Sequence, residues 1–94
     1  MKKINAYNFR CTCRACPTQF EFKDENNRKY YFRLRWYGWY LADITNEEDW
    51  KYLISGECKQ FGSIDKENFL KLMKKNGYDI QIQKNKKKEN RINA

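Results

Sequence analysis

The sequence predicts an α+β fold, an antiparallel meander sheet with two helices packed on one face and a final C-terminal strand. Apolar side chains alternate with basic or amphipathic ones over residues 29–37, which is the period-2 pattern of a half-buried strand. Over residues 45–77 apolar side chains recur instead at three- and four-residue spacings, which is typical of helices. The 94 residues give room for one modest core, so we expect a single domain over 1–83 and a basic tail over 84–94.

Strands are predicted at 6–15, 18–23, 29–37 and 39–44, and Pro17 should end the first because proline cannot donate to a ladder. In the first strand, alternation places Tyr7, Phe9, Cys11, Cys13 and Ala15 on one face and Asn8, Arg10, Thr12 and Arg14 on the other. The turn at Gly38 could hold two residues or a bulge, so the facing of Trp39 stays open.

The second and third strands should form a hairpin, because residues 24–28 have the composition of a turn. Inward side chains must oppose inward side chains, which requires a loop of odd length. Pairing Phe22 with Phe32 and Phe20 with Leu34 satisfies this rule. The same register sets Glu21 opposite Arg33 on the outer face.

Two helices are predicted after the meander. Thr45 and Glu48 fit a capping box, followed at helical spacing by Trp50, Leu53, Ile54, Cys58 and Phe61, although Gly56 could end this helix early. The second helix should begin after Asp65 as N-cap and end at Gly77, with an apolar stripe made by Phe69, Leu70, Leu72 and Met73. Alternation over 78–83 predicts the last strand.

The net charge of +8 favours an anionic partner. Residues 84–94 hold five basic residues and one acid, so the tail carries +4 and the rest of the chain +4. Nucleic acid or a nucleoprotein is the expected partner, and an acidic protein surface is an open alternative. No apolar run approaches a spanning helix and no secretory leader is evident, so we expect a cytoplasmic protein that binds no membrane and no small-molecule substrate.

The four cysteines leave three interpretations open, which are a zinc site, small core residues, and disulfide or redox chemistry. Cys11, Cys13, Cys16 and Cys58 could supply four thiolates to zinc, but their spacing is not that of paired C-x-x-C units. Alternatively they are small core residues, because Cys11 and Cys13 fall on the apolar side of their strand. We favour structural thiols and expect no cofactor.

The composition argues against catalysis. The chain has no histidine, the commonest general base near neutral pH. Ser55 and Ser63 are the only serines, and the four glycines form no phosphate-binding loop. We therefore expect a binding protein and no enzyme.

The outer face of the predicted sheet is the candidate binding site. Arginine suits planar anionic groups, and aromatic rings stack on unpaired bases. The candidate residues are Arg10, Arg14, Tyr31, Arg33, Arg35, Tyr37 and Trp39, assisted by Lys86, Lys87 and Lys88 of the tail. The other interpretation is a solvated face, where Thr, Tyr and Arg serve strand propensity alone.

The first half of the chain resembles a loose group of small bacterial and phage proteins. Cys16-Pro17-Thr18-Gln19-Phe20-Glu21, followed by Tyr31-Phe32-Arg33-Leu34-Arg35-Trp36 and Gly38-Trp39, carries this resemblance, which implies a hairpin and no activity. In size, charge and Asn, Lys and Ile content the chain also resembles small accessory proteins of phages and mobile elements. These include anti-CRISPR inhibitors, so inhibition of a host defence protein by protein–protein contact is the alternative function.

Overall fold

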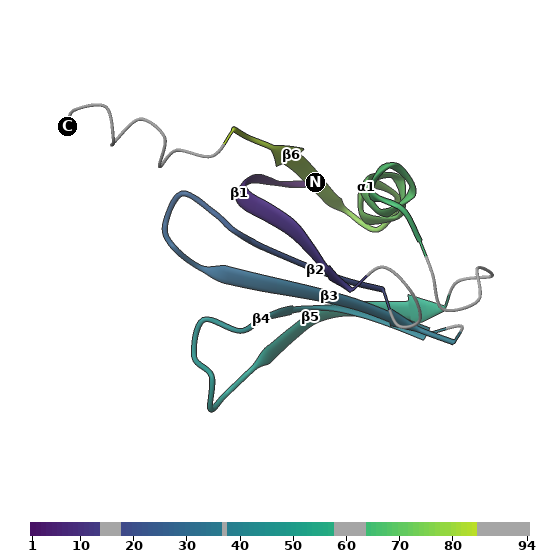
Figure 1. The fold of residues 1–94 in the computed structure, drawn as a ribbon, viewed down its shortest axis with the longest axis horizontal. Helices are drawn as coiled ribbons and strands as arrows, with labels where there is room; N and C mark the ends of the chain where they lie inside the picture. Colours follow the sequence, from purple (N-terminus) through teal and green to yellow (C-terminus); the bar gives the residue numbers. More distant parts are fainter. Residues whose placement is uncertain (14–17, 37, 58–63, 85–94) are drawn as a thin grey trace.

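The computed structural model shows a curled six-stranded mixed sheet with one short helix, and it describes residues 1–13, 18–36, 38–57 and 64–84 (Figure 1). The strands are β1 (Lys2–Cys13), β2 (Thr18–Lys23), β3 (Lys29–Arg35), β4 (Gly38–Asp43), β5 (Lys51–Glu57) and β6 (Tyr78–Ile82), and the helix is α1 (Lys66–Lys75). Their order in the sheet is β5-β4-β3-β2-β1-β6. β1 to β5 form an antiparallel meander, whereas β6 pairs with β1 in parallel.

The predicted fold class is therefore wrong in two respects. Within the segment predicted as the first helix, Lys51–Glu57 form strand β5, whereas Cys58 and Phe61 lie outside the described residues. The sheet is also mixed instead of antiparallel. The Thr45 hydroxyl does not cap a helix, because it donates to the Asp43 carboxylate and accepts from the Lys29 amide. The pattern of Trp50, Leu53 and Ile54 imitates a helix because Leu53 is an extra residue in a bulge of β5, which breaks the alternation.

The second predicted helix is present. Asp65 caps α1 by accepting from the Asn68 amide at 2.9 Å, and Gly77 follows its end with a φ of +92°. Phe69 and Met73 are fully buried, and Lys74 and Lys75 lie in the last turn, where the helix dipole favours cations.

The core lies between α1 and the sheet face that we call the inner face. The ring of Phe69 lies 4.7 Å from that of Phe32 and 4.9 Å from that of Phe20, measured between ring centres. Phe9 and Phe22 also contact Phe69, and we call these five residues the inner phenylalanine cluster. Trp39 belongs to the same core, with 4% of its surface exposed, and this settles the facing that the sequence left open.

The hairpin register differs from the prediction by two residues. Phe20 pairs with Phe32 and Phe22 with Tyr30, so the parity is right but Glu21 faces Tyr31 and not Arg33. The polar residues of the turn hold this register. The Asp24 carboxylate accepts from the Asn26 and Arg28 amides and from the Tyr30 hydroxyl.

A bulge near the middle of β1 reverses its facing. Tyr7 pairs with Lys23 but Arg10 pairs with Glu21, so β1 has one more residue than β2 over this stretch. Ile4 and Ala6 are buried before the bulge, and Phe9 packs against the core after it. The prediction that Tyr7 shares the face of Phe9 is therefore wrong, because it assumed unbroken alternation along β1.

Candidate functional site

The outer face of the sheet, opposite α1, combines an aromatic half with a basic half. Register places Arg10, Glu21, Tyr31, Ala42 and Tyr52 in one row across β1 to β5. The next row contains Gln19, Arg33, Tyr40 and Ser55. Arginines from β1 and β3 therefore lie on one face, as the candidate site requires.

The aromatic half covers β3, β4 and the start of β5. We call Tyr31, Tyr40, Trp50 and Tyr52 the outer aromatic cluster. Tyr31 contacts Trp50 edge-on with ring centres 5.5 Å apart, and Tyr40 contacts Tyr52 at 5.1 Å. Tyr52 is 63% exposed and Trp50 37%, so the cluster offers ring surface to solvent. Ala42 beneath it is fully buried, which leaves the rings close against the sheet.

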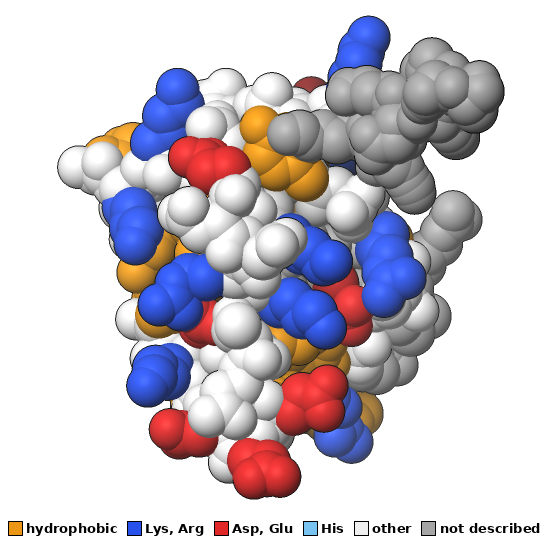
Figure 2. Space-filling view, turned by 90° about the vertical axis from the view of Figure 1, so that its left-hand side faces the viewer, with side chains coloured by type: hydrophobic (Ala, Val, Ile, Leu, Met, Phe, Trp, Pro, Cys, Tyr) orange, Lys and Arg blue, Asp and Glu red, His pale blue; other side chains and the backbone are white. Residues whose placement is uncertain are grey.

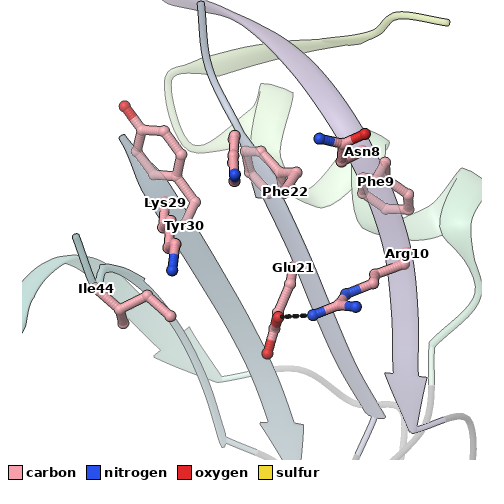
Figure 3. A pocket seen from close by; sticks show the side chains of 9 residues that line it. Asn8, Phe9, Arg10, Glu21, Phe22, Lys29, Tyr30 and Ile44 are labelled. Atoms are coloured by element: carbon pink, nitrogen blue, oxygen red, sulfur yellow. Dashed lines mark hydrogen bonds and ion pairs between the residues drawn. The ribbon is translucent and has the colours of Figure 1, made fainter. Parts of the chain in front are cut away.

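The basic half lies over β1, β2 and the start of β3. Arg10, Lys23 and Lys29 line a hollow of about 540 Å³ together with Asn8, Glu21 and Ile44, and we call it the basic hollow (Figure 3). Arg10 and Glu21 point toward one another there and form an ion pair at 2.8 Å. Lys23 and Lys29 are directly opposed in the β2–β3 register.

Arg33 joins the two halves. It lies beside Tyr40 on β4, and its Nε is buried without a hydrogen-bond acceptor in the described part of the chain. A buried donor left without an acceptor costs about 1–3 kcal/mol. Arg35 lies further along β3, with its guanidinium 6.0 Å from the centre of the Trp36 ring.

One described residue of the predicted site, Trp39, does not contribute to this face. Trp39 is buried on the inner face, where its Nε1 donates to the Glu57 carbonyl at 3.3 Å. Outside the described residues lie the predicted Arg14, Tyr37, Lys86, Lys87 and Lys88. Conversely, the prediction omitted Trp50, Tyr52, Lys23 and Lys29. The prediction assigned Trp50 and Tyr52 to a helix. Alternation along each strand already placed Lys23 on the face opposite to that of Phe22, and Lys29 on the face opposite to that of Tyr30.

Charge on the molecule is mixed. Figure 2 shows Lys and Arg side chains across the face at the left of Figure 1, with Asp and Glu side chains between them. Asp43 is 8% exposed and binds Arg28 at 2.9 Å. Burial acts to raise the pKa of Asp43, but hydrogen bonds from Thr45 and the Arg28 charge outweigh it and hold the pKa below its usual 3.8.

Tyr30 is kept neutral by its surroundings. Burial raises its pKa far above the usual 10, and the hydrogen bond to the Asp24 carboxylate at 3.0 Å acts in the same direction. Its ring stacks on Phe22 and therefore belongs to the core. Its hydroxyl binds Asp24 in the β2–β3 turn. This tyrosine serves structure and offers no acid–base group at neutral pH.

Most of the cysteines that could form the predicted zinc site lie outside the described part of the chain. Cys16 and Cys58 lie there, as does the side chain of Cys13. Cys11 is exposed and lines a second hollow of about 470 Å³ with Phe9 and Ile64, so the prediction that it is a small core residue is wrong. Across the described ranges, no group of three or more Cys, Asp, Glu or His side chains could hold a metal ion.

Comparison with known proteins adds no identification: the chain matches no protein-family model, no curated protein and no solved structure. Among the described residues, no helix is both long enough and apolar enough to cross a membrane.

Proposed function

We propose that this protein binds single-stranded nucleic acid, alone or within a nucleoprotein, through the outer face of its sheet and without catalysis. The observation that carries the proposal is the continuity of the outer aromatic cluster with arginine and lysine on neighbouring strands. Tyr31 pairs with Glu21 of the basic half and contacts Trp50 of the aromatic half. Sheets that carry both aromatic and basic side chains are a common platform for unpaired bases.

The chemistry of the two halves is complementary. Exposed rings of Trp50 and Tyr52 stack on bases whatever their sequence, at about 1–3 kcal/mol for each base. Arginine and lysine side chains attract phosphates and give affinity that falls as salt rises. Arg33 lies half-buried between the halves, and its guanidinium can donate to a phosphate or base oxygen.

The test is fluorescence anisotropy of labelled oligonucleotides, single-stranded and duplex, at several salt concentrations. We expect salt-sensitive binding to single strands and weaker binding to duplexes, whose bases are already stacked. Trp50→Ala should weaken binding about tenfold, because it removes one stacking ring. Trp36→Ala is the matched control, since Trp36 is 53% exposed but lies outside the outer aromatic cluster. Absence of binding at low salt would falsify the proposal.

A protein partner is the second candidate function, in the manner of a phage or mobile-element inhibitor. Two observations favour it. Acids interrupt the basic side chains, as at Glu21, and exposed Tyr52 and Leu53 lie on β5, an edge strand of the sheet. Affinity purification from a host extract with and without nuclease separates the two functions, because a partner retained after nuclease treatment is bound by protein contact.

A further inference from the structure

We propose that the basic hollow is a phosphate subsite, in which Lys23, Lys29 and Arg10 hold one phosphate group of a bound polynucleotide. This inference rests on the proposed function and names the part of the ligand that the basic half takes. It begins from the placement of three cations around one hollow of about 540 Å³ (Figure 3).

The two lysines carry an electrostatic cost in the folded protein. They are directly opposed on neighbouring strands, and like charges at such positions repel. Within the ranges that the structure describes, neither lysine forms an ion pair. A phosphate between the two ammonium groups would replace this repulsion with two attractions.

The bulge of β1 completes the hollow. Asn8 and Phe9 together oppose one residue of β2, and Asn8 has a φ of +56°. Because of this extra residue, Phe9 turns to the core and Arg10 turns to the outer face opposite Glu21. Bulges commonly re-aim a side chain in this way next to binding sites.

Glu21 is the acid of the hollow and sets the position of Arg10. Its carboxylate holds the guanidinium at 2.8 Å, and 32% of the Glu21 side chain is exposed. A guanidinium has five donors, so Arg10 can keep this contact and still donate to a phosphate. The carboxylate nevertheless opposes an anion, and its removal should strengthen phosphate binding.

The hollow borders the outer aromatic cluster. Glu21 on its wall is opposite Tyr31, whose ring contacts Tyr40 and Trp50. A single strand can therefore place a phosphate in the hollow while a neighbouring base stacks on the cluster. The contacts of Lys23, Lys29 and Arg10 with this phosphate would then supply part of the salt dependence of binding.

The experiment compares the variant K23Q/K29Q with K71Q/K74Q in oligonucleotide binding. Lys71 and Lys74 are exposed on α1, on the other side of the sheet, so both variants lose the same net charge. Each phosphate contact on a single strand contributes about 0.7 to the slope of log K against log salt. Because the hollow holds one phosphate, K23Q/K29Q should lower that slope by about 0.7, whereas K71Q/K74Q should leave it unchanged.

Two further measurements separate this inference from the proposed function. In NMR titrations with inorganic phosphate, amide shifts should move at Asn8, Lys23 and Lys29, even if no oligonucleotide binds. Glu21→Gln should raise phosphate affinity severalfold. Comparison of oligonucleotides with and without a 5′-phosphate shows whether a terminal or an internal phosphate occupies the hollow.

The outcomes are distinct. If oligonucleotides bind but both double variants change the slope equally and phosphate moves no signal at the hollow, the subsite is refuted and the proposed function stands. If phosphate binds at the hollow but no oligonucleotide does, the proposed function is refuted and the hollow is a site for small phosphates. A Glu21→Gln variant that weakens phosphate binding also overturns the inference.

Discussion

Two clusters of aromatic rings lie on opposite faces of one sheet, and they differ in composition and exposure. The inner cluster consists of Phe69, which is fully buried, and the four phenylalanines around it. The outer cluster consists of three tyrosines and Trp50, and it remains partly exposed. Ring separations are similar in the two clusters, between 4.7 and 6.4 Å for Phe69 and its neighbours and between 5.1 and 6.3 Å for the outer pairs.

The difference in side chain explains the difference in role. Phenylalanine has no polar atom, so its whole surface gains from burial. Tyrosine and tryptophan each carry a polar group that tolerates water, which suits them to surfaces that meet a partner. We therefore expect substitutions in the inner cluster to change stability and substitutions in the outer cluster to change binding.

Phe69→Ala should produce the largest loss of stability. It removes the ring on which four other phenylalanines converge and leaves a cavity under the sheet. The free energy of unfolding should fall by about 3–5 kcal/mol, measured by urea denaturation. Tyr52→Ala in the outer cluster is the counterpart, and it should cost less, about 1–3 kcal/mol, the value of its two aromatic pairs. Equal losses in the two variants would contradict the division between the faces.

Asp43→Asn should destabilise the protein by roughly 1.5–3 kcal/mol near neutral pH, because it weakens charged hydrogen bonds to Arg28 and Thr45. The pKa of Asp43 is lowered by folding, so its stabilisation is fully present above the usual value of 3.8. It is lost as pH falls through the lower folded pKa. Unfolding curves from pH 7 to pH 2 should show the two proteins converging at the acid end.

Asp49→Asn is the control for that experiment. Asp49 lies 3.9 Å from Lys51, and both side chains are about two-thirds exposed. An exposed pair of this kind contributes little, so the variant should follow the wild-type curve within about 0.5 kcal/mol. A constant offset between Asp43→Asn and wild type across the whole pH range would show that the charge of Asp43 plays no part.

Gly56→Ala tests how closely the inner face is packed at its β5 edge. A methyl group at Gly56 would lie 2.9 Å from Cζ2 of Trp39, a ring that is buried and tied by its Nε1 to the Glu57 carbonyl. The variant should lose about 1–3 kcal/mol in urea denaturation. Gly38→Ala is the matched control, because no atom of the described residues, its chain neighbours left out, lies within 4 Å of a methyl group there.

Sequence patterns predicted those parts of the fold in which alternation or spacing is unbroken. β2, β3, β4, α1 and β6 lie close to their predicted positions, because Phe20, Phe32 and Leu34 alternate cleanly and Asp65 caps a regular helix. The parallel pairing of β6 with β1 was not predictable in this way. This pairing depends on the edge of the sheet at which the chain arrives after α1, and no local sequence pattern encodes that choice.

The errors in predicted secondary structure and facing occur where a strand contains an extra residue. Leu53 interrupts β5 and made a strand resemble a helix, whereas the bulge at Asn8 moved Tyr7 to the face opposite that of Phe9. Arg10 nevertheless fell on the predicted face, because the prediction followed the alternation after the bulge. For the candidate site, alternation brought out Tyr31 and Arg33, but Trp50 and Tyr52 were missed together with β5.

The bulge at Asn8 allows β1 to serve both faces, and its conformation provides the last prediction. At a φ of +56° asparagine is tolerated, glycine is unstrained and a β-branched residue is strongly disfavoured. Asn8→Gly should leave the unfolding free energy nearly unchanged, whereas Asn8→Val should lower it by about 1–2 kcal/mol. If the valine variant avoids this strain by expelling the bulge, Arg10 turns from the outer face and phosphate affinity at the basic hollow falls as well. Urea denaturation and phosphate titration of the same two variants therefore measure how far one backbone position supports both the core and the binding face.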